Sequence, residues 1–396
     1  MHLTRICFLV VFLCTLADYA HAAAKMVIAE SGAGKNLIEH SLPAATLAAA
    51  MGVEYLELHV VMTADDHLVV FHDLTLDRLT DVAQVFPDRK RQDGASYVID
   101  FTLDELRRLR LLGSADGNNN EFPLVLPIPT LAEELRLLRR LETILERRLG
   151  IVLEIRQPWF HQQADKDISG ATLDTLARLR YTTAQSKLYL QCYDPDELQR
   201  IHDRLMPERQ MSLPLIQLVG ANDGRETKQG TRDNLLPYNY DWLFTNTGLR
   251  MVASYAVALA LPAKEIVDGT GNVPLAGYIA EAHRHGLMVL ASLPHNTPNF
   301  PSFAPDLPSL VDFYFSRAGV DGIYTDIFAD VQRILRQQLE MKKVESTPQN
   351  ETPTPTKERL PEPQNDLPPF FKNLNLSRPT PPDSEQAVDK EKVLPE

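Results

Sequence analysis

Short apolar runs alternate with helix-forming segments along the middle of the chain. Nine runs have the length and residue types of β-strands: 26–29, 53–61, 67–73, 150–156, 187–193, 214–220, 257–262, 286–293 and 320–326. Several are apolar at successive positions, which is typical of strands covered by helices on both faces. The pattern predicts an α/β fold, a (β/α)8 TIM barrel with one extra or antiparallel strand.

Two connections depart from a regular strand–helix alternation. Residues 63–66, "TADD", are too few for a crossover helix, so the strands on either side of them are expected to form a hairpin. Residues 74–130 are too many for an ordinary loop. They are predicted to form a small inserted subdomain over one face of the barrel.

Two helices begin with a capping-box pattern. Thr102 is followed three residues later by Glu105, and Thr130 by Glu133. The second helix carries an apolar stripe at helical spacing. Its members are Leu131, Leu135, Leu138, Leu141 and Leu145.

The first 22 residues have the pattern of a secretory signal peptide. Arg5 precedes an apolar run, 6–16, and Ala20-His21-Ala22 is a small-x-small cleavage site. An uncleaved anchor is the alternative, but the run is short for a bilayer. Cleavage would leave a periplasmic or secreted protein with no membrane span.

The carboxyl-terminal segment, 341–396, is rich in proline and charge and lacks periodicity. It is expected to be a disordered tail, which leaves 23–340 for the barrel domain. Phe370 and Phe371 are its only adjacent aromatic residues, and a tail-binding protein partner is one possible role for it.

Charge and cysteine content narrow the classes of function. The formal net charge of −13 argues against a nucleic-acid surface, but a site can still be locally suited to a small anionic ligand. With Cys7 and Cys14 removed in the signal peptide, Cys192 is the only cysteine, so no intrachain disulfide can form.

Charged side chains occur inside predicted barrel strands. Glu57 and His59 share one strand face, and Glu154 and Arg156 repeat that spacing on another strand. Such groups destabilise a barrel unless they are paired or bind something. Structural pairing remains open for any one of them, but several at one barrel mouth predict a site. Three further polar residues stand at strand ends: His72, Asp73 and Asp326.

Five segments resemble the bacterial periplasmic glycerophosphodiester phosphodiesterases. They are "VIAESGAGKNLIEHSLPA", "YLELHVVMTADDHLVVFHDLTLDRLTDV", "LEIRQPWFH", "LYLQCYDPDELQRI" and "GIYTDI", and the resemblance extends over about 25–335. It implies a (β/α)8 barrel with an inserted subdomain. It also implies hydrolysis of a small phosphodiester ligand, a glycerophosphodiester, to an alcohol and glycerol 3-phosphate, usually with calcium.

The resemblance assigns roles to particular residues. His72 matches one of the family's two catalytic histidines. Glu57 and Glu154 match metal ligands. Arg156 stands where a phosphate-binding lysine is usual and keeps the positive charge.

The chain departs from the family pattern at three positions. Glu30 and Ser31 replace a His-Arg pair that supplies the other histidine and a phosphate-binding arginine, and His59 replaces a metal-binding aspartate. Loss of a positioned proton donor lowers a rate by about 10²–10⁴-fold. Three hypotheses follow: a weak or inactive relative, a working enzyme in which Glu30 or His59 substitutes, or a non-catalytic ligand-binding or partner-binding barrel.

The candidate site therefore has catalytic residues His72 and Glu30, substrate-binding residues Arg156 and Ser31, and a metal set. The metal set is Glu57, His59 and Glu154. Calcium is the family's ion, whereas zinc or another transition ion is expected if His59 is a ligand. No metal is expected if the site is dead and His59 only pairs with Glu30 or Glu57.

Overall fold

The structure is a computed structural model that describes residues 25–34, 36–112, 126–231, 234–293 and 300–346. The predicted signal peptide lies outside the described residues. So does the predicted tail from residue 347 onward, so both stay predictions.

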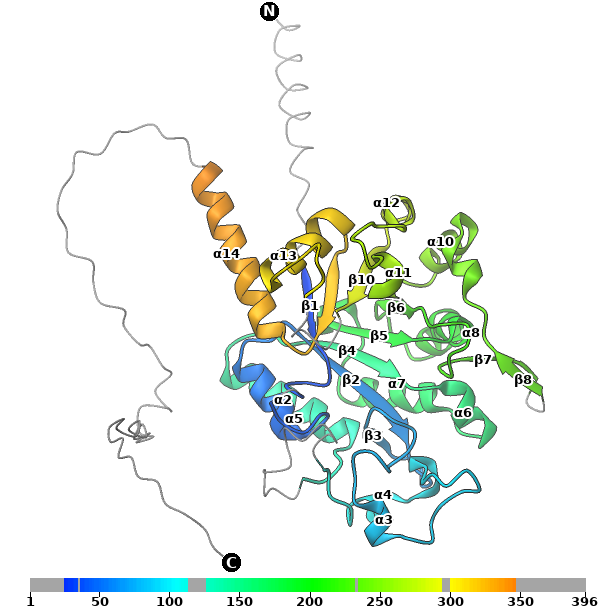
Figure 1. Ribbon diagram of the computed structural model, residues 1–396. Coiled ribbons are helices and arrows are strands. Elements are labelled where there is room, and N and C mark those ends of the chain that lie inside the picture. The colour runs from blue at the N-terminus through cyan, green and yellow to red at the C-terminus, as the bar shows by residue number, and fades with distance from the viewer. Residues whose placement is uncertain (1–24, 35, 113–125, 232–233, 294–299, 347–396) are drawn as a thin grey trace, which may run out of the picture. The chain divides into compact units, whose positions relative to one another are not determined.

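Eight parallel strands form a closed barrel (Figure 1). Around the barrel they are β1 (Met26–Ala29), β11 (Gly322–Thr325), β10 (Met288–Ser292), β9 (Ala258–Pro262), β6 (Leu215–Leu218), β5 (Leu188–Cys192), β4 (Gly150–Ile155) and β2 (Tyr55–Met62). Pairing of Ile28 with Tyr55 joins β1 to β2 and closes the ring. The predicted α/β barrel is confirmed.

The predicted hairpin is also confirmed. Strand β3 (Leu68–Val70) runs antiparallel to β2, with Val60 opposite Val70. One element was missed: β7 (Lys228–Thr231) and β8 (Asn234–Pro237) form a separate antiparallel pair. Their residues are largely polar or exposed, so they lack the apolar pattern by which the barrel strands were recognised.

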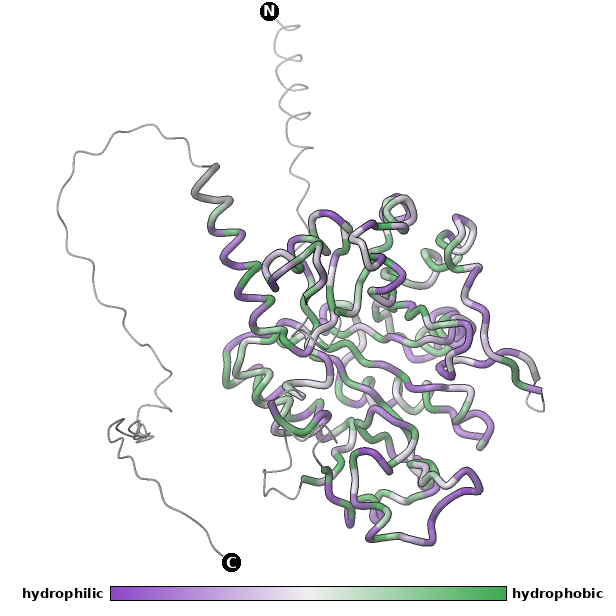
Figure 2. The backbone as a smooth tube through the Cα atoms, viewed as in Figure 1, coloured by the Kyte–Doolittle hydropathy of each residue, from purple (hydrophilic) through white to green (hydrophobic). Residues whose placement is uncertain are grey.

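Helices connect the strands and cover the outside of the barrel (Figure 1). They are α2 (Leu42–Ala50), α5 (Leu131–Ile144), α6 (Pro158–Gln163), α7 (Ile168–Arg178), α8 (Pro195–Arg200), α9 (Met206–Glu208), α10 (Asn246–Ala253), α11 (Ala263–Ile266), α12 (Ala276–Arg284), α13 (Leu307–Asp312) and α14 (Phe328–Ser346). Figure 2 shows the barrel strands mainly in the hydrophobic colour and α14 alternating between both colours, as an amphipathic helix does.

Shorter helical turns complete the connections. They are the 3-10 turns η1 (Val98–Asp100), η2 (Ala184–Ser186) and η4 (Asp241–Phe244), and the wider turns η3 (Ile201–Leu205) and η5 (Phe313–Ala318). Helix α14 continues through 341–346, the first residues of the predicted tail. Among the helices of the described residues, none is long and apolar enough to span a bilayer.

The described residues of the predicted insertion, 74–112 and 126–130, form a subdomain around a second hydrophobic cluster. It contains α3 (Val82–Val85), η1 and α4 (Leu103–Leu106), and it lies beyond the arrowhead end of β2 in Figure 1. Its buried side chains include Leu76, Leu79, Val98, Phe101, Leu106 and Ile128. They pack against Val61, Val69 and Phe71 of the hairpin, which ties the subdomain to the barrel.

Both predicted capping boxes are present. Thr102 accepts from the Glu105 amide and Thr130 from the Glu133 amide, and each glutamate accepts from the cap residue's own amide. Three leucines of the α5 stripe are buried and the last two are partly buried, as the spacing predicted.

Glu134 of α5 is a polar exception within this buried face. Its side chain is 1% exposed, and its Oε2 has no hydrogen-bond partner among the described residues. Burial raises the pKa of this carboxyl from 4.5 to about 8. The unfolded chain therefore releases this proton at a lower pH than the folded chain. Stability falls as the pH rises from 4.5 toward 8, by on the order of 3 kcal/mol at neutral pH.

Glu134→Gln is expected to stabilise the protein. At neutral pH the Glu134 carboxyl is ionised in the unfolded chain and must take up a proton on folding, whereas the amide is neutral in both states. The gain should be small below the unfolded pKa and grow to about 3 kcal/mol at neutral pH. Urea unfolding at several pH values measures it. Glu146→Gln, an exposed position just after α5, is the matched control. An equal gain in the free energy of unfolding at every pH would contradict the raised pKa of Glu134.

Candidate active site

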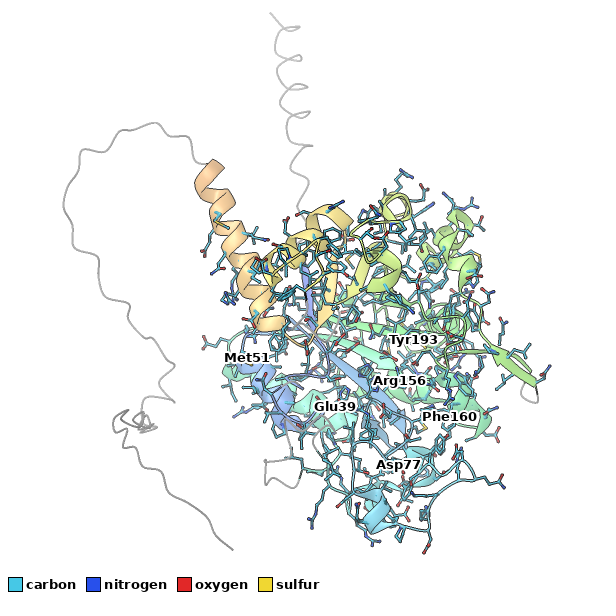
Figure 3. All side chains as sticks on the ribbon, viewed as in Figure 1. Glu39, Met51, Asp77, Arg156, Phe160 and Tyr193 are labelled. Atoms are coloured by element: carbon cyan, nitrogen blue, oxygen red, sulfur yellow. The ribbon has the colours of Figure 1, made fainter. Side chains whose placement is uncertain are left out.

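A pocket of about 600 Å³ opens at the carboxyl ends of the barrel strands. All seven residues of the candidate site predicted from the sequence line it: Glu30, Ser31, Glu57, His59, His72, Glu154 and Arg156. Figure 3 labels Arg156 and Tyr193, which lie near each other after β4 and β5 and line the same pocket. The opposite wall is mainly apolar and comes from Leu218, Val219, Ala260, Leu261 and Pro262. The location agrees with the mouth that the sequence predicted.

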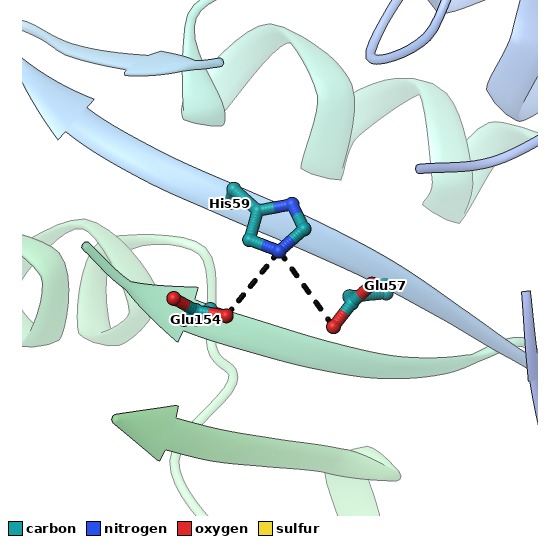
Figure 4. A group of neighbouring side chains, drawn as sticks. All are labelled: Glu57, His59 and Glu154. Atoms are coloured by element: carbon teal, nitrogen blue, oxygen red, sulfur yellow. Dashed lines mark ion pairs between the residues drawn. The ribbon is translucent and has the colours of Figure 1, made fainter. Parts of the chain in front are cut away.

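The predicted metal set forms one buried cluster (Figure 4). Glu57 and His59 project from β2, and the register places His59 opposite Glu154 on β4. His59 Nε2 lies 3.3 Å from Glu154 Oε2 and 3.7 Å from Glu57 Oε1. One ligand atom from each residue falls within 4.8 Å of the others. Two carboxylates and an imidazole at this spacing can hold a divalent metal ion.

The two carboxyl groups of this cluster have opposite pKa shifts. Burial would raise the pKa of Glu154, but the Arg156 guanidinium and His59 outweigh it and lower the pKa to about 2. Burial raises the pKa of Glu57 well above 4.5, and the nearby carboxylates of Glu30 and Glu154 add to the rise. Glu154 is therefore the ionised member, and Glu57 is the member that holds a proton more readily.

A hydrogen-bond chain across the barrel interior fixes Glu57. The Gln191 amide donates to Glu57 Oε1 at 2.8 Å, and the Tyr324 hydroxyl donates to Gln191 Oε1 at 2.6 Å. These groups belong to β2, β5 and β11, and Gln191 is fully buried. Three strands thus hold one carboxylate in place.

Arg156 is almost fully buried and is shared between two carboxylates. One terminal nitrogen lies 2.5 Å from Glu154 Oε1, and the other lies 3.2 Å from Glu226 Oε2. Glu226 comes from the segment before β7, and its backbone carbonyl accepts from the Trp159 indole at 3.1 Å. Although burial lowers the pKa of Arg156, these carboxylates outweigh it and raise the pKa above its usual value, so the charge persists.

His72 belongs to a half-exposed polar network at the pocket rim. Its Nδ1 lies 2.6 Å from Asp73 Oδ1, and Arg78 donates to Asp73 Oδ2 and to Glu39 Oε1. Although burial raises the pKa of Asp73, the hydrogen bonds from His72 and Arg78 lower it well below 3.8. The ionised Asp73 keeps a proton on Nδ1 of His72, which leaves Nε2 as the nitrogen for proton transfer.

Glu30 and Ser31 lie where β1 enters a tight turn. The Glu30 amide donates to the Thr325 carbonyl, and its Oε1 accepts from the Ser292 hydroxyl at 3.1 Å. The backbone then turns through positive φ values at Ser31 and Gly32, 51° and 80°. A Cβ at residue 32 would also meet the backbone of α2 at 3.3 Å, so glycine suits this turn on both counts.

His40 is a member of the cluster that the sequence reasoning missed. It is buried behind the pocket wall, with its Nε2 2.8 Å from His59 Nδ1 and 3.1 Å from Ser31 Oγ. Burial lowers the pKa of His40, and the neighbouring His59 lowers it further. Burial also lowers the pKa of His59, although Glu154 opposes this. Both imidazoles are therefore neutral near pH 7.

The pocket lining carries more negative than positive groups. Six carboxyl side chains line it, against the guanidiniums of Arg78 and Arg156: Glu30, Glu39, Glu57, Asp73, Glu154 and Glu226. An anionic ligand would meet net repulsion there unless a bound cation or protons on the carboxyl groups offset it. The pocket therefore suits an anion only together with a counter-charge.

Several lining residues carried weak signals in the sequence. Arg78 stands six residues after His72 in a segment quoted for the family resemblance, and Glu39 neighbours His40 in another. Glu226 lies in a segment with no strand or helix pattern. Asp326, named from the sequence at the end of β11, is not among the residues that line the pocket.

Comparison with known proteins gives a consistent family. A model described as "Glycerophosphoryl diester phosphodiesterase family" matches residues 31–329. The glycerophosphodiester phosphodiesterase of Treponema pallidum is 34% identical over 77% of this chain and 90% of its own length. That of Haemophilus influenzae is 35% identical over 76% of this chain and 87% of its own length.

Solved structures share the fold. A putative glycerophosphoryl diester phosphodiesterase from Silicibacter pomeroyi superposes with a TM-score of 0.59 at 24% identity, over 80% of this chain and 95% of that one. A phosphodiesterase from Oleispira antarctica, solved with sn-glycerol-3-phosphate, gives a TM-score of 0.52 at 17% identity, over 79% of this chain and 97% of that one.

Removing one member of the buried ion pair is expected to cost more stability than removing both. Glu154→Gln leaves the Arg156 guanidinium with Glu226 alone and should lower the free energy of unfolding by about 3 kcal/mol, while Glu154→Gln/Arg156→Met should recover at least half of this. Urea unfolding in EDTA measures both variants. Glu208→Gln, which breaks the exposed pair with Arg204, is the control and should change stability by less than about 1 kcal/mol. If the double variant is less stable than Glu154→Gln alone, the two side chains do not stabilise each other as a pair.

Proposed function

The chain belongs to the glycerophosphoryl diester phosphodiesterase family, and we propose from this premise that it hydrolyses glycerophosphodiesters to an alcohol and glycerol 3-phosphate. The observation that carries the proposal is the gathering of the seven candidate-site residues around one pocket. A proton-transfer group, two guanidiniums and a candidate metal set lie together there. These are the components that phosphodiester hydrolysis needs.

His72 is proposed as the general acid and base. Hydrolysis joins a water oxygen to phosphorus and breaks the bond from phosphorus to the alcohol oxygen. The attacking water must lose a proton and the leaving oxygen must gain one. With Nδ1 held by Asp73, the Nε2 of His72 can take the first proton and return it.

The two guanidiniums are proposed to bind the phosphate. Arg78 lies at the rim beside His72, and Arg156 lies on the pocket floor beside Glu154. Both are paired with carboxylates, so the phosphate has to compete with Asp73, Glu39 and Glu226 for them. Ser31 is proposed to add a hydroxyl donor in place of the family's arginine.

A divalent cation held by Glu57, His59 and Glu154 would neutralise phosphate charge and polarise the phosphorus–oxygen bonds. The ligand set indicates which ion. Calcium takes six to eight oxygen ligands, whereas zinc and other transition ions accept imidazole. We therefore propose a transition ion in preference to calcium wherever His59 is a ligand.

The rate is proposed to be low compared with relatives that carry the His-Arg pair. Glu30 can carry a proton, but its oxygen already accepts from Ser292 and its charge opposes an anionic phosphate. The alternative, a barrel that binds its ligand without turnover, rests on this same departure. Export to the periplasm or the medium, and a role of the tail in binding a partner, remain proposals from the sequence.

Restoring the pair with Glu30→His/Ser31→Arg is expected to raise kcat/KM on glycerophosphocholine by at least about 10²-fold, because it adds a proton-transfer group and a phosphate-binding cation. Release of glycerol 3-phosphate, measured with calcium and with zinc, provides the readout. Glu30→Gln/Ser31→Ala is the matched control, since it removes the charge and adds neither group.

Two results would contradict parts of this proposal, the first the low rate and the second the hydrolysis itself. A wild-type rate equal to that of the restored variant would mean that Glu30 or His59 already does the chemistry. If neither protein turns over with either ion but both bind glycerol 3-phosphate, the non-catalytic barrel would replace the hydrolase.

A further inference from the structure

Three imidazoles lie together beside the carboxylate cluster. The His40 and His59 rings meet edge to face with centroids 4.8 Å apart, and His72 lies 4.8 Å from His59 on the pocket side. The Nε2 atom of His59 faces the carboxylates, and its Nδ1 atom contacts His40. The carboxylates and His40 therefore decide together which ring nitrogen of His59 carries a proton.

The contacts of His40 decide which nitrogen carries its proton. Its Nε2 lies 2.8 Å from His59 Nδ1 and 3.1 Å from Ser31 Oγ, two groups that can each accept a proton or donate one. Its Nδ1 is buried and has no hydrogen-bond partner among the described residues. A buried N–H without an acceptor is rarer and less favourable than a bare acceptor. The proton therefore belongs on Nε2, where one N–H serves both neighbours.

The proton on Nε2 of His40 determines the tautomer of His59. Its Nδ1 accepts from His40, and a neutral imidazole has only one N–H. The proton of His59 is then on Nε2, the nitrogen 3.3 Å from Glu154 and 3.7 Å from Glu57. In this form His59 donates toward the carboxylates and has no lone pair to offer there.

We infer that His40 is a positioning residue that holds the Nε2–H of His59 toward the carboxylate of Glu154, with Glu57 beside it, and that this lowers the affinity of the set for divalent ions. The inference rests on the site of the proposed function. A metal ion needs a bare imidazole nitrogen. For Nε2 of His59 to bind one, its proton must leave, and the proton on His40 Nε2 must cross to His59 Nδ1. His40 must then take a proton on Nδ1, where no described residue accepts it.

The backbone holds His40 in this position. Both His40 and Ser31 have positive φ values, 54° and 51°, and the His40 amide donates to the Ser31 carbonyl at 3.3 Å. Left-handed conformations are uncommon for residues other than glycine and persist where surrounding contacts over-determine them. The turn after β1 thus sets the distance from His40 to both Ser31 and His59.

Two substitutions separate this arrangement from a merely structural histidine. In His40→Gln the side-chain oxygen can accept from Nδ1 of His59 while its NH₂ donates to Ser31, so the ion-binding form of His59 no longer requires a proton on the buried Nδ1 of residue 40. Zinc affinity is expected to rise about tenfold above wild type. In His59→Asp an oxygen ligand replaces the imidazole, and calcium affinity is expected to rise at least about tenfold.

Isothermal titration of the full chain with zinc chloride and with calcium chloride measures these affinities. His161→Gln is the matched control: His161 is equally buried, but its Nε2 accepts from the Met62 amide away from the pocket. Its affinity for both ions should equal that of wild type, while any loss of thermal stability in EDTA reports its structural role.

The proton position is tested directly on wild type, which does not depend on any variant folding. Nitrogen-15 NMR of histidine-labelled, EDTA-treated protein should show the His59 proton on Nε2 and the His40 proton on Nε2. A proton on Nδ1 of His59 would overturn the inference. So would zinc binding to wild type as tight as to His40→Gln.

Failure of this inference and failure of the proposed function give different results. Wild type that binds zinc tightly and releases glycerol 3-phosphate would overturn the role of His40 and leave the hydrolase standing. The expected proton positions and affinities, with no turnover even in Glu30→His/Ser31→Arg, would support the role of His40 and overturn the hydrolase.

Discussion

The burial of two carboxyl groups side by side in a barrel interior is the constraint from which the rest of the site follows. Glu57 and Glu154 are each less than 10% exposed and stand on neighbouring strands. Two charges in this environment would repel each other and lose their hydration. The protein resolves this by pairing one with Arg156 and by leaving the other easier to protonate.

Neighbouring side chains hold this pair of carboxyl groups in place. Gln191 donates to Glu57 from a second strand and is itself held by Tyr324 from a third, and His59 lies between the two carboxyl groups. The closed barrel makes this possible, because its parallel strands deliver side chains from several directions to one end. The apolar opposite wall leaves the charged groups on one side of the pocket, where a phosphate and its counter-charge would meet them.

The architecture was predictable because it depends on local patterns. All nine proposed strands exist, since apolar runs covered on both faces are distinctive over a few residues. The β7–β8 pair was not predicted, because Lys228–Thr231 and Asn234–Pro237 have no such pattern. Capping boxes were likewise found because their partners are only three residues apart.

The site was predictable where two members share a strand face, as Glu57 with His59 and Glu154 with Arg156. His40 and Glu226 were missed for a physical reason. Each comes from a connecting segment, and its role depends on a contact with a residue 19 or 70 positions away along the chain. Such contacts are set by the closed barrel and by turn geometry, neither of which is visible in the local pattern.

The protonation of Glu57 tests the central claim most directly. Infrared difference spectroscopy between wild type and Glu57→Gln, in EDTA at about pH 6, detects the carbonyl stretch of a protonated carboxyl group. The raised pKa of Glu57 predicts a band from a buried, protonated carboxyl in wild type that is absent from the variant. If the difference spectrum shows only an ionised carboxylate at Glu57, both buried groups are charged together, which contradicts the division of protonation between Glu57 and Glu154.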